Sequence, residues 1–185
     1  MTPARHAHMP AGGLTPATLV RADIARRIPH QHSMCLLDRV TSWDLQQICC
    51  EADSHRSLDN PMRAHGRLGA SCGIEYAAQA MAVHGALIAE SRGGASVIGD
   101  AKAGSQPARG GYLVSVRSVS LFALQLDTVA GQLTVTAERI SGDANTVLYS
   151  FAVLDGPRTL LSGRAIVVLD PPDPVAGLVA DRISA

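Results

Sequence analysis

The segment Gly73–Glu90, with the sequence GIEYAAQAMAVHGALIAE, constrains the fold of this chain more than any other feature. It is rich in Ala, Met, Leu, Glu and Gln, which favour helix, and no proline interrupts it. Apolar residues occupy nearly every face of that helix rather than a single stripe. A helix that is apolar all round is usually buried. We therefore predict one long central helix that the rest of the chain must cover.

Segments of strand-like composition lie on both sides of this helix. Two precede it and four follow it: Met34–Trp43, Gln47–Asp53, Tyr112–Leu126, Gly131–Ile140, Thr146–Leu154 and Thr159–Leu169. Short runs of turn residues separate the last strands, and short turns join antiparallel neighbours. One helix cannot cover both faces of such a sheet, so the sheet must curl around the helix. The sequence predicts an α+β fold with a curved antiparallel sheet wrapped around one long buried helix.

The chain is long enough for one domain of ordinary size and too short for two. Residues 1–18 are rich in Pro, Gly, Ala and His, and the segment after Asp170 opens with two prolines. We therefore predict a flexible arm over 1–18, a single domain over 19–170 and a C-terminal tail over 171–185. No apolar leader and no apolar run of about 18 residues occurs, so we expect a cytoplasmic protein without a membrane span.

Composition narrows the classes of function. Sixteen basic residues balance 16 acidic ones, and aromatic residues make up only 3% of the chain, which together argue against a nucleic-acid partner. The four cysteines, Cys35, Cys49, Cys50 and Cys72, form no C-x-x-C pair and no spacing typical of a metal site. We expect no metal, no cofactor and no nucleic acid.

Two stretches carry a more specific resemblance. The sequence IPHQHSMCLLDRV at residues 28–40 is similar to the opening PH-x-x-P-M-x-L-L-D-R-V of hotdog-fold 3-hydroxyacyl-acyl-carrier-protein dehydratases. The sequence GIEYAAQA at residues 73–80 resembles the start of their central helix, where a Glu or Asp precedes an A-x-A-Q pattern. The two motifs occur in the expected order and separation. The resemblance is closest to the divergent branch found with aryl-polyene and xanthomonadin-type pigment genes.

This resemblance implies a hotdog fold and the elimination of water from a 3-hydroxyacyl thioester, carried by an acyl-carrier protein or by coenzyme A. It also implies a homodimer, or a hetero-oligomer with another hotdog subunit. Dehydration needs a base near C2, an acid near the C3 hydroxyl and donors that polarise the thioester carbonyl. In the resembling enzymes a histidine is the base and the helix carboxylate handles the hydroxyl, and the two come from different subunits of a dimer.

The resemblance assigns the carboxylate to Glu75, in the first turn of the helix. It also implies that backbone N–H groups at the helix start, where Gly73 lies, hold the thioester carbonyl. Gln79 lies one turn beyond Glu75 on the same helix face, where the two side chains can hydrogen-bond. We therefore take Glu75 as a candidate catalytic residue, and Gly73 and Gln79 as candidate substrate-binding residues.

The sequence marks the histidine less clearly. The usual signature H-F-P-G-x-P-x-M-P-G is absent, and counting back from Glu75 places the expected histidine at or beside Asn60. His65 and His55, in the same loop, are our candidates for the base, and His30 inside the first motif is a third. Without the usual histidine, two alternatives stay open. One is a thioesterase that activates water at Glu75, and the other is a non-catalytic hotdog subunit that binds acyl chains or pairs with an active homologue.

The loop Ser54–Gly69 carries an uneven share of the charge. The segment contains three basic residues, Arg56, Arg63 and Arg67, and one acidic residue, Asp59, so its local net charge is +2. Acyl-carrier proteins are acidic and deliver a phosphate, which arginine binds well. We therefore predict that these three arginines form a small patch that receives the carrier and its substrate.

Overall fold

The computed structural model describes residues 18–91, 111–143 and 145–169. The predicted tail, nearly all of the predicted arm and all of the chain between the central helix and the next strand lie outside these residues. The helical elements are α1 (Arg21–Ala25) and α2 (Gly73–Ser91), with single 3-10 turns at His32–Met34, Ser54–Arg56 and Ala70–Cys72. The strands of the described chain are β1 (Leu19–Val20), β2 (Arg39–Trp43), β3 (Gln47–Ala52), β4 (Gly111–Leu121), β5 (Leu133–Gly142), β6 (Thr146–Asp155) and β7 (Arg158–Leu169).

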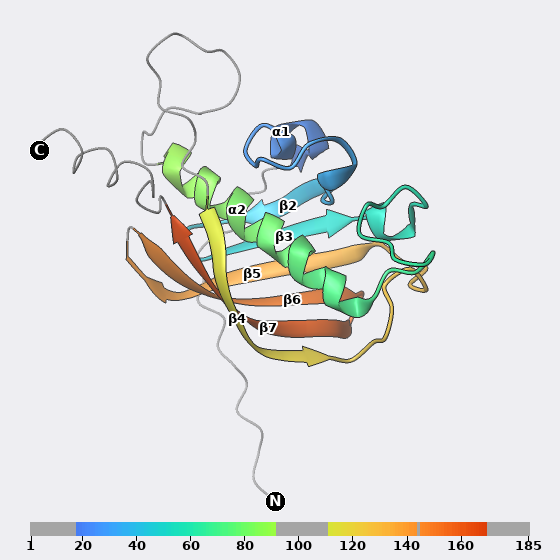
Figure 1. Cartoon of the computed structure of the whole chain (residues 1–185). Helices are drawn as coiled ribbons and strands as arrows, with labels where there is room; N and C mark the ends of the chain where they lie inside the picture. The colour runs from blue at the N-terminus through green and yellow to red at the C-terminus, as the bar shows by residue number, and fades with distance from the viewer. Residues whose placement is uncertain (1–17, 92–110, 144, 170–185) are drawn as a thin grey trace, which may run out of the picture.

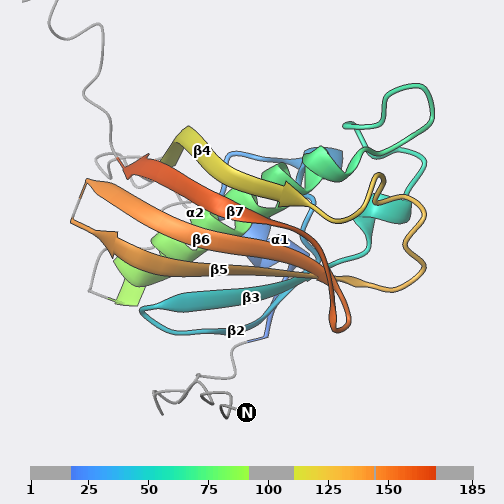
Figure 2. The same cartoon turned by 90° about the horizontal axis from the view of Figure 1, so that it is seen from below.

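These strands form one antiparallel sheet in the order β1-β2-β3-β5-β6-β7-β4. In Figure 1, α2 runs across one face of the sheet, and β4 bends around the helix. Figure 2, from below, shows β2 to β7 side by side with α2 behind them. The predicted arrangement, a curved antiparallel sheet around one long buried helix, is confirmed, and it is the hotdog fold.

The apolar sequence of α2 explains why it lies inside the sheet's curve. Ten of its 19 residues are buried, among them Tyr76, Met81 and Leu87. Packing is tight at the helix start, where a Cβ on Gly73 would lie 2.1 Å from Leu161 Cδ2, so a larger residue would displace the Leu161 side chain. Although apolar, α2 falls short of what a bilayer-crossing helix requires, as does α1, the other helix of the described residues.

The predicted strand Tyr112–Leu126 is split in the structure, because β4 ends at Leu121. The Phe122 N–H still donates to the Leu160 carbonyl of β7 (2.8 Å), but Leu124 and Leu126 bond to the segment that leads into α2. The Ala70 N–H donates to the Leu124 carbonyl (3.0 Å), and the Leu126 N–H donates to the Leu68 carbonyl (2.8 Å). The end of this predicted strand therefore supports the start of the central helix rather than the sheet.

β4 bends because its pairing with β7 is irregular at two places. At the second of them, Ser118 has a φ of 52°, a left-handed conformation that costs a non-glycine residue about 1–3 kcal/mol. An extra residue in one strand of a pair increases the local twist and bends that strand. This irregularity lets the edge strand curl over α2 (Figure 1).

A buried histidine ties α2 to the sheet at two points. The His84 Nε2 lies 2.7 Å from the Asp44 carbonyl oxygen, and its Nδ1 lies 3.1 Å from the Tyr149 hydroxyl. A carbonyl can only accept, so Nε2–H donates to Asp44 and the Tyr149 hydroxyl donates to Nδ1. Burial lowers the pKa of His84 and raises the pKa of Tyr149 to about 12. Both groups are therefore neutral in the folded protein at neutral pH.

We expect acid to destabilise the fold partly through His84. Its folded-state pKa lies below the unfolded value of about 6.5, so the unfolded chain binds the proton first and stability falls as the pH drops below 6.5. One such histidine contributes at most about 1.4 kcal/mol per pH unit. Denaturant unfolding at pH 7 and pH 5 measures the loss, which should be smaller in His84→Gln because an amide does not titrate. Equal losses in the two proteins would contradict this role.

Candidate active site

A buried amide joins the two sequence motifs. The Gln79 side chain on α2 donates through Nε2 to the Met34 carbonyl (2.8 Å) and accepts at Oε1 from the Leu36 N–H (2.9 Å). Because these backbone groups bond to Gln79 rather than to another strand, the strand predicted to begin at Met34 begins only at Arg39. The Gln79 Nε2 also donates to Glu75 Oε1 at 3.0 Å. Both amide hydrogens of this candidate substrate-binding residue thus bond to the protein, and one of them holds Glu75.

A turn after α1 carries His30 to the same carboxylate. The His30 Nε2 lies 3.1 Å from Glu75 Oε1, and the two side chains are 31% and 27% exposed. The neighbouring Gln31 anchors this turn, because its Nε2 donates to the carbonyls of Ala25 (2.8 Å) and Ile28 (3.2 Å). His30 and Glu75 therefore form a histidine–carboxylate pair that is partly open to an incoming molecule.

The His30 ring is not committed to a structural role. Its Nδ1 is buried and has no hydrogen-bond partner among the described residues, so Glu75 is its one polar contact in this part of the chain. His84, by contrast, uses both ring nitrogens within the core. His55 also leaves its buried Nδ1 without a partner among the described residues, but His55 is fully buried, whereas the His30 side chain is 31% exposed. The single contact of His30 with a carboxylate fits a group that reacts.

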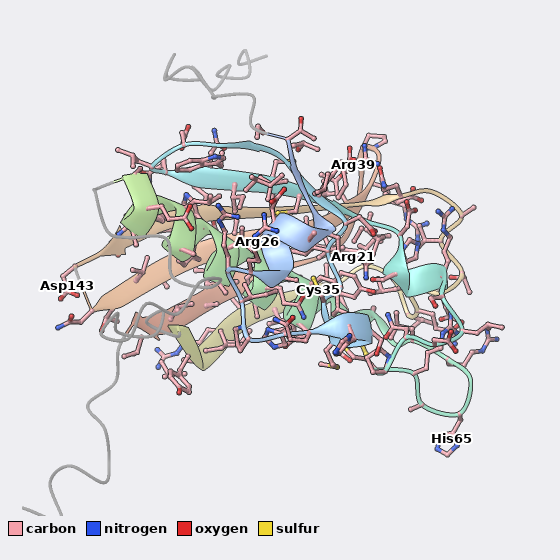
Figure 3. All side chains as sticks on the ribbon, turned by 90° about the horizontal axis from the view of Figure 1, so that it is seen from above. Arg21, Arg26, Cys35, Arg39, His65 and Asp143 are labelled. Atoms are coloured by element: carbon pink, nitrogen blue, oxygen red, sulfur yellow. The ribbon has the colours of Figure 1, made fainter. Side chains whose placement is uncertain are left out.

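The structure does not bring the other two candidate histidines to Glu75 within the described chain. His55 is fully buried, its Nε2 lies 3.2 Å from the Val129 carbonyl oxygen, and burial lowers the pKa of His55. His65 is exposed, with a φ of 52°. Figure 3 shows His65 at the tip of a loop, pointing away from the ribbon.

Asn60 stands where the motif count places the usual histidine. It is buried, and its Nδ2 donates to the Tyr76 hydroxyl (3.0 Å) and to the Ser54 carbonyl (3.0 Å). Its Oδ1 accepts from the Met62 N–H (3.0 Å). Tyr76 follows Glu75 on α2, so the Asn60 amide supports the start of the helix through its hydrogen bond with Tyr76. The position expected to hold the base thus holds a structural side chain.

Gly73 begins α2 at the closest approach between helix and sheet. Its N–H points to the carbonyls of Ala70 and Ser71 and closes the 3-10 turn that precedes the helix. The predicted donation from this N–H to a thioester carbonyl would require that turn to open. In the structure Gly73 sets the position of the first helical turn, on which Glu75 lies.

The loop arginines have unequal surroundings. Arg63, with only 11% of its side chain exposed, donates to the carbonyls of Ser57 (2.7 Å) and Gly66 (2.9 Å) and lies 3.6 Å from Asp127. Arg67 is 61% exposed and lies 3.4 Å from the same carboxylate. Arg63 therefore holds the loop together from inside, whereas Arg67 keeps most of its guanidinium in solvent.

Arg56 is partly exposed, donates to the Ala130 carbonyl (2.6 Å) and forms an ion pair with Asp53. Asp53 and Asp127 both lie outside the segment Ser54–Gly69, whose charged residues give the net charge of +2. These two carboxylates offset the net charge of +2 that the segment carries by itself. The exposed positive charge is thus confined to Arg56 and Arg67 and is weaker than the sequence predicts.

In the described part of the chain, no group of three or more His, Cys, Asp or Glu side chains is arranged to hold a metal ion. Two surface hollows, of about 480 and 400 Å³, lie against the β4–β5 connection and against β5 and β6. Neither hollow is lined by His30 or Glu75. The pair, whose side chains are 31% and 27% exposed, lies outside these two hollows.

Comparison with known proteins agrees with this fold. A sequence profile of the ApeP-like family, described as ApeP dehydratase, matches residues 22–178, and a comparison with curated proteins gives no match. The dehydratase heterocomplex ApeI:P from Xenorhabdus doucetiae is similar in structure, with a TM-score of 0.68 and 19% identity over 84% of this chain and 96% of that chain. An uncharacterized protein from Pyrococcus horikoshii gives a TM-score of 0.51 and 12% identity over 82% and 95%. The profile spans most of the sequence, and the chain belongs to the ApeP-like dehydratase family.

Proposed function

We propose that this protein eliminates water from a 3-hydroxyacyl thioester, with His30 and Glu75 as the reacting pair. The observation that carries the proposal is the 3.1 Å contact between His30 Nε2 and Glu75 Oε1. The reaction removes a proton from C2 and a hydroxyl from the adjacent C3, so its base and its acid must stand close together. Membership of a dehydratase family supports the same class of reaction.

In the proposed reaction His30 is the base and Glu75 the acid. His30 takes the proton from C2, and the electron pair of that C–H bond forms the C2–C3 double bond. The C3–O bond breaks, and the hydroxyl leaves as water with the proton that Glu75 supplies. The products are one 2-enoyl thioester and one water. The histidinium then loses its proton to solvent and the Glu75 carboxylate regains one at the oxygen that gave it, which restores both groups.

The hydrogen bonds to Glu75 indicate which oxygen acts. His30 and Gln79 both contact Oε1. Oε2 has no hydrogen-bond partner among the described residues and can face the substrate hydroxyl. Gln79 is in this proposal a positioning residue, since it holds the carboxylate in place without touching the substrate.

We propose that the substrate is a thioester of an acyl-carrier protein or of coenzyme A. We also propose that the protein acts on it in the cytoplasm. Both carriers bring a phosphate on their pantetheine arm, and the exposed guanidinium groups of Arg56 and Arg67 suit such a group. All four cysteines are free thiols, which suits a reducing compartment. Arg63 is left out of this binding role, because its donors are engaged inside the loop.

We propose that a second hotdog subunit, a copy of this chain or a homologue, pairs with β4. This strand is an edge of the sheet, and the large apolar residues Tyr112, Val114 and Leu121 on it are exposed. A long edge strand with exposed apolar side chains tends to pair with another strand. The similar structure from Xenorhabdus doucetiae is a heterocomplex, which supports a partner of the homologous kind.

Removal of either reacting group should abolish dehydration. The assay incubates the purified protein with a 3-hydroxyacyl-carrier protein and follows enoyl product and free thiol. We expect enoyl product, and a loss of about 10²–10⁴-fold in turnover in His30→Ala and in Glu75→Gln, because each variant lacks one proton-transfer group. His65→Ala is the matched control and should leave turnover near that of the unaltered protein.

Other outcomes would contradict the proposal in distinct ways. Loss of turnover in His65→Ala but not in His30→Ala would assign the base to His65. Free thiol without enoyl product would show thioester hydrolysis at Glu75. Turnover that appears only when an active hotdog homologue is added would show a non-catalytic subunit.

The arginines should separate into binding and structural groups. Replacing Arg56 and Arg67 together with alanine should weaken binding of the carrier protein, and more so at low salt, because salt screens exposed charges. Arg63→Ala should instead lower the free energy of unfolding by about 1.5–3 kcal/mol, since it removes charge-assisted hydrogen bonds. Carrier titrations at two salt concentrations and denaturant unfolding measure the two effects. Unchanged carrier binding in the double variant would remove the arginines from the proposal.

A charge on the edge strand should disrupt subunit pairing. Val114 is 57% exposed on β4, and Val114→Lys places an ammonium group where we expect the partner strand. Light scattering after gel filtration should show a dimer for the unaltered protein and a lower molar mass for the variant. Leu45→Lys, at a residue that is 56% exposed in the β2–β3 turn, is the matched control and should stay dimeric. A dimeric Val114→Lys protein would place the interface elsewhere.

A further inference from the structure

We infer that each chain carries a complete reacting pair of its own. A second subunit then lines the binding site of the acyl group but contributes no reacting side chain. This inference rests on the proposed function. It differs from the arrangement that the sequence resemblance implies, in which the base and the acid come from different subunits. Three features of the chain support it.

The first feature is that the turn carrying His30 is anchored in the core of its own chain. Ile28 lies two residues before His30 and is fully buried, and so are Leu36 and Leu37 just beyond the turn. Because these buried residues fix both ends of the turn, only the few residues between them can move. A partner is therefore not needed to place His30.

The second feature is a set of hydrogen bonds that close the turn from both ends. Gln31 bonds to the carbonyls of Ala25 and Ile28, which ties the start of the turn to α1. Gln79 bonds to backbone groups of Met34 and Leu36, which ties its end to α2. Gln79 also holds Glu75, so one buried amide sets the base and the acid relative to each other. All of these donors and acceptors belong to the same chain.

The third feature is that the loop expected to lend a base is bonded to its own chain. Asn60, at the expected histidine position, donates to Tyr76 and Ser54. His55 bonds to Val129 and has no exposed surface. The one histidine of this loop that is free to reach another chain is His65, at the loop tip. A base borrowed from this loop would therefore have to be His65, which the turnover of His65→Ala tests.

Complementation between two inactive variants tests the inference. His30→Ala and Glu75→Gln chains with different affinity tags are co-expressed, and the mixed oligomer is isolated on both tags in turn. If each chain holds its own pair, every site in the mixed oligomer lacks one group, and turnover stays as low as in the single variants. If the groups come from different chains, one of the two sites in a mixed dimer regains both, and turnover rises to about half that of the unaltered dimer. That rise would overturn the inference and leave the proposed reaction standing.

A crosslinking experiment tests the same point without turnover. His30→Cys and Glu75→Cys are combined with Cys49→Ser and Cys72→Ser, since the remaining cysteines, Cys35 and Cys50, are buried. After reaction with a short bis-maleimide, we expect a product that runs as one chain on a denaturing gel, with positions 30 and 75 linked in its peptide map. Proteins with only one of the two new cysteines are the control.

The crosslinking result separates the inference from the proposed function. Two chains joined through positions 30 and 75 would overturn the inference, whatever the activity of the protein. A link within one chain, together with no enoyl product from the unaltered protein, would keep the placement of the pair and reject the reaction.

Discussion

The hydrogen bonds of the Gln79 amide are the contacts on which the candidate site depends. This side chain is fully buried, and it satisfies a carbonyl and an N–H in a segment that pairs with no neighbouring strand. A buried backbone group without a partner costs about 1–3 kcal/mol, so the segment before β2 needs this amide to lie against the helix. The same amide holds Glu75. The path of the chain before β2 and the position of the acid are therefore fixed together.

The apolar character of α2 makes its few polar side chains informative. Glu75, Gln79 and His84 lie on a helix packed inside the sheet, and each has specific partners. His84 uses both ring nitrogens and is withdrawn from solvent, which is the state of a core histidine. Among the described residues His30 has Glu75 as its one polar partner, and its side chain is partly exposed. Exposure together with a carboxylate partner thus separates His30 from the fully buried His84 and His55.

The sequence predicts the central helix, the curved antiparallel sheet and the fold class, because these follow from hydrophobic patterns that act over short distances. It also places Glu75, whose motif lies on the helix itself. The sequence does not favour His30 over His55 and His65 as the base. The contact of His30 with Glu75 depends on a turn that packs against α2 through Gln79. Counting along the loop leads instead to Asn60, where the structure has a supporting amide. The charge count fails for the same reason, since Asp127 meets Arg63 and Arg67 only in the folded chain.

If His30 and Glu75 of one chain react as proposed, this fold can separate the elimination step from the choice of substrate. The reacting pair is held by contacts within the chain, whereas neither surface hollow reaches it and the apolar edge of β4 is exposed. A partner strand on β4 would add surface for an acyl chain without changing the distance between His30 and Glu75, because that distance is set by Gln79 and the turn. Exchange of one hotdog partner for another would then alter which acyl groups fit and leave the elimination step unchanged.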